Sequence, residues 1–333
     1  MKPLRYTFAL LLLSVVAAAY VWNQYRSFVD TPLLIPEQGF NLQVARGASV
    51  RAVIGELQQK GMTRADWRWR ILTRLQPSTI KAGEYALNAG LKPPALLKLL
   101  ASGEVISYRF TIIEGWTYRQ LLEALGRDPV LEKTIPELDG DERVLAAAGV
   151  EVEHPEGWFL PETYQFVRGD SDVDILARAH SGMVTELENA WSGRAEDLPL
   201  ESAYELLILA SIVEKESGLE EERADIAGVF MRRLQQGWRL ETDPTVIYGI
   251  GESYDGDIRR RDLDTDTPYN TYTRFGLPPT PIAMPGPSAL QAVAAPADGT
   301  AMFFVASGTG GHVFSDTLDE HNAAVRKMLR NKP

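Results

Sequence analysis

The longest apolar run in the chain lies at its N-terminus. Twenty uncharged residues separate Arg5 from Arg26, which is about the length that a helix needs to cross the hydrocarbon core of a bilayer. Lys2 and Arg5 precede the run, and this charge bias predicts a cytoplasmic N-terminus with the remainder outside. An A-x-A sequence at residues 17–19 offers the alternative of a cleaved signal peptide. Because apolar residues continue past that site, we favour an uncleaved single-pass transmembrane anchor in residues 1–26.

Three segments after a short linker repeat one pattern of an apolar strand, a glycine turn and an amphipathic helix. They cover residues 40–61, 85–103 and 110–126, and each predicted helix is closed by a glycine, a common left-handed stop. Residues suited to begin these helices are Ser49, Pro93, Pro94, and Thr117 with Gln120 as a capping box. Strand and helix pairs of this kind pack as α+β layers.

Two of these pairs fall within residues 38–105. The arrangement resembles a LysM-like module, a small unit that binds polymers of N-acetylglucosamine. A structural spacer that holds the next domain away from the membrane would show the same pattern. Both interpretations therefore stay open.

The character of the chain changes near residue 151. Three segments are expected to be helices: residues 172–191, 205–217 and 220–236. The second is apolar on nearly every side, as a buried central helix is. Residues 242–287 suggest a long ordered loop, followed by a helix, two strands about a GTGG turn, and a helix opened by Thr317 and Glu320. We predict an α+β fold in which residues 106–333 form the larger mixed domain.

Composition excludes several classes of function. The 333 residues have a net charge of −11, which gives no electrostatic footprint for nucleic acid. The absence of cysteine excludes disulfides, a thiol nucleophile and thiolate metal sites. The four histidines lack HExxH or any other ligand spacing, so we predict neither a metal site nor a cofactor.

The segment LASIVEKESG, residues 209–218, places two glutamates one residue apart at the end of the buried helix. Side chains two positions apart on a helix point about 200° from each other, so Glu214 and Glu216 cannot face one substrate together. If the Glu216 face lines a cleft, its apolar neighbours disfavour the charged form and keep a proton available, as a general acid requires. Glu214 is then expected to face outward or to form a salt bridge. Helix geometry alone does not separate a catalytic Glu216 from a solvated helix end.

Several sequence elements in order carry a resemblance to a known family. Besides the N-terminal anchor and the LysM-like region, they are EGWFLPETY (156–164), LASIVEKES (209–217), LETDPTVIYG (240–249) and YNTYTRFGLPPTPIAMPG (269–286). With these elements the chain resembles the MltG-like (YceG-like) endolytic murein transglycosylases. These are single-pass inner-membrane proteins of bacteria that cut nascent peptidoglycan glycan strands.

The resemblance implies a mechanism and a location. The family's catalytic acid is the second glutamate of an EKE[ST] motif, which corresponds to Glu216, and Ser217 completes a Glu-Ser pair. We then expect an endolytic lytic transglycosylase that cleaves the MurNAc–GlcNAc bond and leaves a 1,6-anhydro-MurNAc end. It would terminate or release strands during cell-wall elongation. The resemblance places the catalytic domain in the periplasm, tethered to the inner membrane, with peptidoglycan strands as substrate and peptidoglycan synthases as candidate partners.

Other side chains could form the glycan-binding groove. Sugar rings stack on aromatic side chains and need amide and hydroxyl partners at their edges. The candidate substrate-binding residues are Trp158, Glu162, Ser217, Asp243, Thr245, Tyr248, Asn270 and Tyr272. Each aromatic residue could equally belong to the core. Asp243 suits capping or bracing a turn, and no pair spacing marks it, Glu162, Asp264 or Asp266 as a second catalytic carboxylate.

Two other functions fit the same residues. One is a non-catalytic glycan-binding scaffold of the cell-wall synthesis machinery, in which Glu216 is inert. The other is a lysozyme-type hydrolase, whose product has a reducing end that is one water heavier than an anhydro end.

Overall fold

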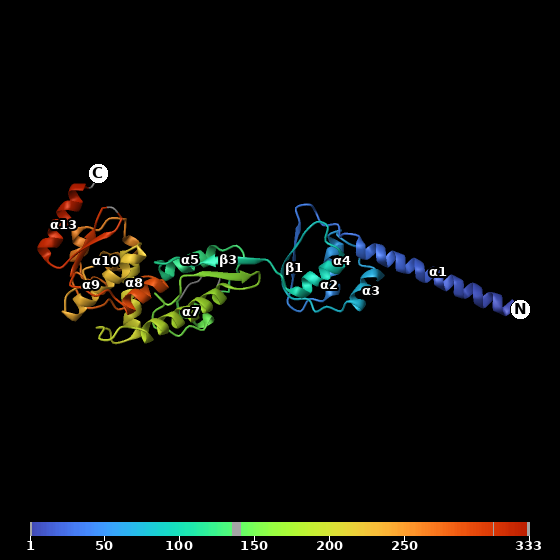
Figure 1. Cartoon of the computed structure of the whole chain (residues 1–333), viewed down its shortest axis with the longest axis horizontal. Helices are drawn as coiled ribbons and strands as arrows, with labels where there is room; N and C mark the ends of the chain where they lie inside the picture. The colour runs from blue at the N-terminus through green and yellow to red at the C-terminus, as the bar shows by residue number, and fades with distance from the viewer. Residues whose placement is uncertain (1, 135–140, 309, 332–333) are drawn as a thin grey trace. The chain divides into compact units, whose positions relative to one another are not determined.

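The computed structural model describes residues 2–134, 141–308 and 310–331. Contacts divide the chain into two compact units (Figure 1). The N-terminal unit comprises residues 1–108 and 165–169, and the C-terminal unit comprises residues 109–164 and 170–333. Mixed α+β structure is present as predicted, and the described strands form three two-stranded sheets.

The N-terminal unit packs its helices around one antiparallel strand pair. Its elements are α1 (Lys2–Asp30), β1 (Phe40–Val44), α2 (Val50–Gln59), α3 (Trp67–Leu75), β2 (Gly83–Leu87) and α4 (Pro93–Ser102). Strand β1 pairs with β2 from Phe40 opposite Leu87 to Val44 opposite Gly83. Leu42, Leu57 and Tyr85 are fully buried between the sheet and the helices. The alternation of β1 and the stripe of α2 therefore meet in one core.

Helix α1 differs along its length. Large apolar side chains between Phe8 and Trp22 are exposed on it, whereas Tyr25 and Phe28 near its end are buried in the N-terminal unit. Within the described residues, no helix is both long and apolar enough to cross a membrane.

The sequence predicted most helix boundaries of this unit but missed α3. Ser49 and the first-turn prolines act as predicted, and Gly47 and Gly90 take positive φ in their turns. Helix α3 begins at its N-cap Asp66, whose side chain accepts a hydrogen bond from the Arg68 backbone. Helix α3 carries many charged residues, so its apolar stripe is too narrow to indicate a helix in the sequence.

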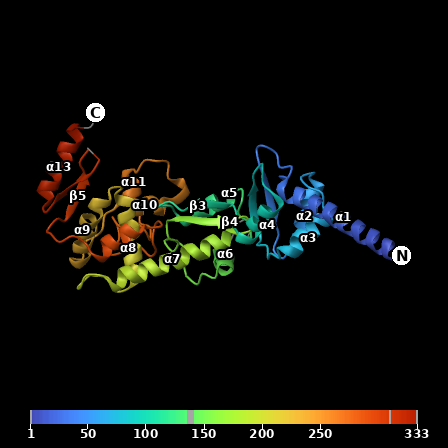
Figure 2. The same cartoon turned by 45° about the vertical axis from the view of Figure 1, so that its right-hand side comes forward.

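The C-terminal unit is built mainly from helices (Figure 2). Its elements are β3 (Ser107–Thr111), α5 (Tyr118–Arg127), α6 (Asp141–Ala148), β4 (Thr163–Val167), α7 (Asp172–Ser192), α8 (Ala203–Glu216), η1 (Glu220–Glu222), α9 (Arg223–Gln235), α10 (Asp243–Ile250), η2 (Gly251–Ser253), α11 (Arg260–Asp264), α12 (Pro287–Ala294), β5 (Phe303–Ala306), β6 (His312–Ser315) and α13 (Leu318–Asn331). Strands β3 and β4, which both cross the boundary between the units, form one sheet, and β5 pairs antiparallel with β6. This pairing confirms the predicted hairpin.

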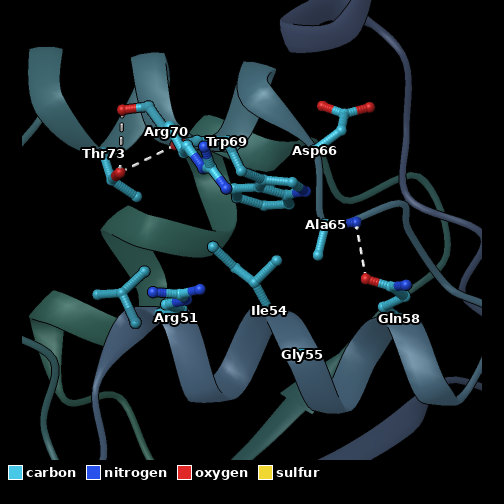
Figure 3. Close-up of a pocket in the computed structure, with 10 residues that line it drawn as sticks. Arg51, Ile54, Gly55, Gln58, Ala65, Asp66, Trp69, Arg70 and Thr73 are labelled. Carbon is cyan, nitrogen blue, oxygen red and sulfur yellow. Dashed lines mark hydrogen bonds between the residues drawn. The ribbon is translucent and has the colours of Figure 1, made fainter.

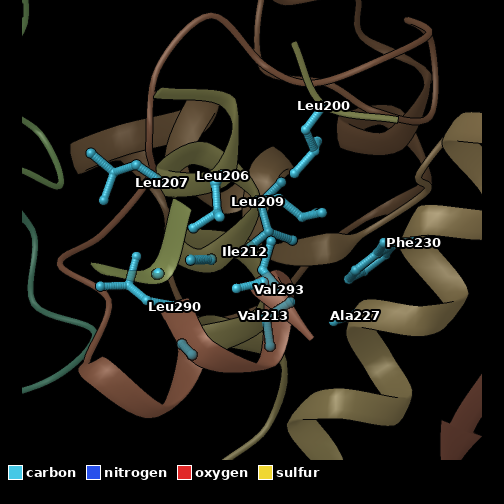
Figure 4. Packing of buried hydrophobic residues seen from close by; sticks show 14 of the residues in the cluster. Leu200, Leu206, Leu207, Leu209, Ile212, Val213, Ala227, Phe230, Leu290 and Val293 are labelled. Carbon is cyan, nitrogen blue, oxygen red and sulfur yellow. The ribbon is translucent and has the colours of Figure 1, made fainter. Parts of the chain in front are cut away.

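Helix α8 is the centre of the C-terminal unit. Every residue from Leu206 to Val213 is buried, and α8 contacts α7, α9, α10 and α12 (Figure 4). Phe230 of α9 and Val293 of α12 belong to the same apolar cluster. The prediction of a helix that is apolar on nearly every side is therefore confirmed, and its surroundings explain why it needs no polar face.

Two predictions for this unit were wrong in detail. Residues 242–287 are not a continuous loop, because α10, η2 and α11 lie within them. These helices are too short to show a clear period, and Pro244 in the first turn of α10 looked like loop composition. Gly126 does not close its helix, since α5 continues to Arg127.

Candidate active site

Glu216 is the last residue of α8. The N-cap Ser202 fixes the start of this helix by accepting a hydrogen bond from the Glu205 backbone, and Ser217 ends it in an extended conformation. The Ser217 hydroxyl accepts a 3.0 Å hydrogen bond from the Leu219 backbone N–H. Ser217 thus shapes the turn after α8 and leaves Glu216 at a fixed position on the helix end.

The Glu216 carboxyl lies against the start of α10. The Thr242 hydroxyl donates a hydrogen bond to Oε1 of Glu216. Burial raises the pKa of the Glu216 carboxyl, and the hydrogen bond from Thr242 opposes this rise. The negative charge of Asp243 raises the pKa further, while the charges of His312 and Arg233 lower it. The net effect favours a protonated Glu216, as a general acid requires.

Thr242 is itself held by a buried hydroxyl cluster. Its backbone N–H donates to the Thr271 hydroxyl at 3.1 Å, and the Thr245 hydroxyl donates to its carbonyl at 2.8 Å. Thr242 is 2% exposed and Thr245 is fully buried. Thr245, which we expected in the glycan groove, therefore positions Thr242 from inside the core.

Asp243 and Tyr272 join α10 to the following loop beside Glu216. The Tyr272 hydroxyl donates a 2.7 Å hydrogen bond to Oδ1 of Asp243. Asn270 orders the same loop: its amide nitrogen donates to three backbone carbonyls, and its Oδ1 accepts from the Tyr272 backbone at 2.8 Å. Asn270 is 1% exposed, so its side chain shapes the loop from within.

Sequence reasoning missed two basic side chains, Arg233 and His312, that influence the pKa of Glu216. Arg233 of α9 is buried and donates to the carbonyls of Met302 and Leu240 at 2.9 and 2.6 Å. His312 of β6 is bound to Glu222 through both its backbone N–H and its ring Nδ1, each at 2.8 Å. Neither stands in a local motif, because each reaches the site from a distant part of the chain.

Glu214 does not face solvent. Its side chain is 5% exposed and forms a 2.7 Å ion pair with Arg223, whose side chain is 7% exposed. It also accepts a 2.9 Å hydrogen bond from the Gly286 backbone N–H. The expected salt bridge is therefore present, whereas an outward orientation was wrong, since Arg223 and the 269–286 loop cover this face of α8.

The structure spreads the other candidate residues over the C-terminal unit. Trp158 stacks on Tyr204 with ring centroids 5.9 Å apart and lines a cavity of about 500 Å³ that Glu216 does not line. Glu162 is exposed, and its backbone carbonyl accepts from Ile112. Tyr248 packs edge-on to Tyr269 and lines a separate cavity of about 570 Å³. Of these candidates, Asp243 and Tyr272 interact electrostatically with Glu216.

Burial raises the pKa of Glu156 as well as those of Glu216 and Glu214. Burial raises the pKa of Glu156 to about 7. Hydrogen bonds donated by the Tyr118 backbone at 2.8 Å and the Tyr248 hydroxyl at 3.0 Å oppose this rise. Both oxygens are therefore occupied by donors, which tie the start of α5 to α10. Glu156 braces the helix that carries Thr242. Among the described residues, no group of three or more acidic or histidine side chains could hold a metal ion.

Comparison with known proteins identifies the family. Residues 42–327 match the YceG-like family. The chain belongs to the YceG-like family. It is 30% identical over 310 residues to a protein of Bacillus subtilis named endolytic murein transglycosylase, covering 88% of this chain and 85% of that one. A Streptococcus pneumoniae protein of the same name is 24% identical over 333 residues, and the match covers 58% of the length of that protein.

A solved YceG-like structure supports the fold as well. The crystal structure of a YceG-like protein from Listeria monocytogenes is similar to this chain with a TM-score of 0.54 and 27% sequence identity. The similarity covers 86% of this chain and 99% of that one. The fold of this chain is therefore similar to that of a solved YceG-like protein over most of its length.

Removing Arg223 is expected to destabilise the protein. In Arg223→Met the buried Glu214 carboxylate loses its cation, which should lower the free energy of unfolding by about 3–5 kcal/mol at neutral pH. Protonation of Glu214 relieves the penalty, so the loss should shrink in acid. Urea denaturation at several pH values measures both effects. Arg259→Met, which breaks an exposed pair with Asp255, is the matched control and should leave the transition unchanged.

Removing the Thr242 hydroxyl is expected to raise the pKa of Glu216. The hydrogen bond from Thr242 favours the charged carboxylate, so Thr242→Val should move the carboxyl titration to higher pH. Thr242→Ser keeps the hydroxyl and should titrate like the parent. NMR of isotopically labelled glutamate carboxyls, with Glu216→Gln to assign the signal, measures the titration. An identical titration in the valine variant would contradict the assigned contact.

Proposed function

We propose that this protein is an endolytic murein transglycosylase that uses Glu216 as its single catalytic carboxyl. The observation that carries the proposal is the placement of Glu216. It ends a buried helix, accepts a hydrogen bond from Thr242, and has a pKa raised by burial. Membership of the YceG-like family and the name of the Bacillus subtilis relative, endolytic murein transglycosylase, support peptidoglycan glycan strands as the substrate.

The proposed reaction has two proton transfers through one residue. Protonated Glu216 donates its proton to the oxygen that bridges MurNAc and GlcNAc, and the bond from that oxygen to C1 of MurNAc breaks. Glu216, now a carboxylate, accepts the proton of the C6 hydroxyl of the same MurNAc. The C6 oxygen bonds to C1 and forms the 1,6-anhydro end. Glu216 is thereby reprotonated, and no water is consumed.

Surrounding contacts support a mechanism with one carboxyl. Glu214 is held by Arg223 and the Gly286 backbone on another face of α8. Asp243 accepts from Tyr272, and its negative charge near Glu216 favours the protonated acid. We therefore propose that Asp243 and Tyr272 border the bound sugar at the bond that is cut. Ser217, Thr245 and Asn270 act in this proposal by shaping the backbone around it, and Trp158, Glu162 and Tyr248 stay candidates for more distant glycan contacts.

The proposed location is the periplasmic face of the bacterial inner membrane. The exposed apolar side chains of α1 between Phe8 and Trp22, and the uncharged run between Arg5 and Arg26, support a single-pass anchor. The element order β1, α2, α3, β2, with β1 paired antiparallel to β2, supports a LysM-like module in residues 38–105. Residues 106–333 would then form the catalytic domain. Peptidoglycan synthases stay predicted partners.

Glu216→Gln should strongly reduce strand cleavage. The amide has no acidic proton to donate, so the cleavage rate on uncrosslinked glycan strands should fall by about 10²–10⁴-fold. Glu188→Gln, an exposed position on α7, is the control and should cleave normally. Mass spectrometry of the products should show anhydro ends. Full activity in Glu216→Gln would refute the catalytic role, absence of turnover in the parent would favour the scaffold, and reducing ends would favour the hydrolase.

The full chain should stay in the membrane fraction after an alkaline wash. Each arginine placed at the centre of a spanning helix costs about 2.5–3.5 kcal/mol of insertion, so Leu12→Arg combined with Val16→Arg should release the protein. Leu34→Arg changes an exposed residue beyond α1 and should not release it. Release of the parent chain by the wash would contradict the anchor.

A further inference from the structure

The net charge of the chain conceals an opposite charge on its two parts. Residues 1–108 contain 13 Lys and Arg against 6 Asp and Glu, a net charge of +7. Residues 109–333 contain 21 against 39, a net charge of −18. A cationic part is attracted to anionic surfaces even when the whole chain is acidic. The basic residues of the N-terminal unit are therefore the place to look for an anionic partner.

Helix α3 concentrates this charge on one exposed face. Trp67, Arg70 and Arg74 follow one another at helical spacing and are all exposed, and Leu75 beside them is 62% exposed. The opposite face carries Trp69, which is buried. A face that combines arginines with exposed tryptophan and leucine is typical of helices that lie at the surface of a membrane.

Helix α3 packs against the end of α1. The ring of Phe28 in α1 meets Trp69 edge-on with ring centroids 5.2 Å apart, and the Arg68 guanidinium lies 5.2 Å above the same Phe28 ring. The exposed apolar run of α1 ends near Trp22, six residues before Phe28, which is about 9 Å along a helix. Lipid headgroups form a layer about 5–7 Å deep on each side of the hydrocarbon core. If α1 spans the membrane, α3 therefore lies close to the headgroups.

A cavity of about 520 Å³ opens between α2 and α3. Figure 3 shows Arg51 rising from α2 and Arg70 descending from α3 on its two sides. Among the described residues, neither guanidinium has a hydrogen bond or an ion pair, and the Asp66 carboxylate beside them is engaged by Arg68. Two unpaired guanidinium groups across one cavity repel each other, and a phosphate group between them would satisfy both.

We infer that the cavity between α2 and α3 binds the phosphate of an anionic phospholipid headgroup, with Trp67 and Leu75 entering the lipid interface. This inference rests on the membrane anchor proposed above and on no feature of Glu216. It gives the N-terminal unit a task besides spacing, since docking would hold the unit against the bilayer. A neutral glycan strand is the less suitable occupant, because it offers no charge to the two arginines.

The full chain can report its own docking, since it contains no cysteine and one introduced thiol takes a fluorescent label without competition. A label on Leu75→Cys should be quenched by headgroup-level spin-labelled lipid in vesicles of phosphatidylcholine with phosphatidylglycerol, and much less in phosphatidylcholine alone. In Arg51→Gln combined with Arg70→Gln, the ratio of docked to undocked protein should fall at least about fivefold. Arg46→Gln combined with Lys98→Gln removes the same charge outside the cavity and should have a small effect.

A second label on Leu12→Cys separates this inference from the anchor. Quenching of that label by acyl-chain spin labels reports insertion of α1. If the label at position 12 is quenched and the label at position 75 is not, the headgroup site is wrong but the anchor stands. If the label at position 12 is not quenched, both the anchor and the headgroup site are wrong. Equal quenching in neutral vesicles, equal losses in both double variants, or release of the Leu75 label by soluble glycan strands would each refute the headgroup site. None of these outcomes bears on cleavage by Glu216.

Discussion

Burial of α8 is the constraint on which the C-terminal unit depends. The helix is enclosed by α7, α9, α10 and α12, and each fully buried leucine or isoleucine along it contributes about 1.5–3 kcal/mol to folding. A helix packed on all sides cannot rotate or slide without opening the core. Its last residue is therefore fixed relative to α10 and the loop after it, which is what a proton donor needs.

Two carboxyls leave this one helix and have different surroundings. Burial raises the pKa of both carboxyls, but Glu214 meets Arg223 and a backbone N–H, which favour its charged form. Glu216 meets a neutral hydroxyl and lies near the negative Asp243, whose charge raises the pKa of Glu216 further. The same residue type therefore has a compensated charge at one position and, at the other, surroundings that favour the protonated form, because the neighbours differ.

Much of the candidate site could be predicted from the sequence, because the patterns that indicate it lie within short segments of the chain. The apolar run before the EKES sequence predicted a buried helix, and the spacing of its two glutamates excluded a catalytic pair. The family resemblance then selected Glu216. The groove was less predictable: Thr245 and Asn270 look like polar contacts in sequence, yet both are buried and bond to backbone or to other hydroxyls. Polar residues in loops hold the backbone as often as they bind ligands.

The sequence by itself determined the elements whose signals lie within a few turns of chain: the apolar N-terminus, the capped helices and the buried α8. The tertiary structure decided the partners of each carboxyl. The charges of Arg233 in α9 and His312 in β6 act on Glu216, and Glu156 in a preceding loop accepts a hydrogen bond from Tyr248 of α10. It also brought α3 beside the end of α1. Such contacts join residues far apart in the chain, and periodicity reports only which face of an element is buried, not what covers it.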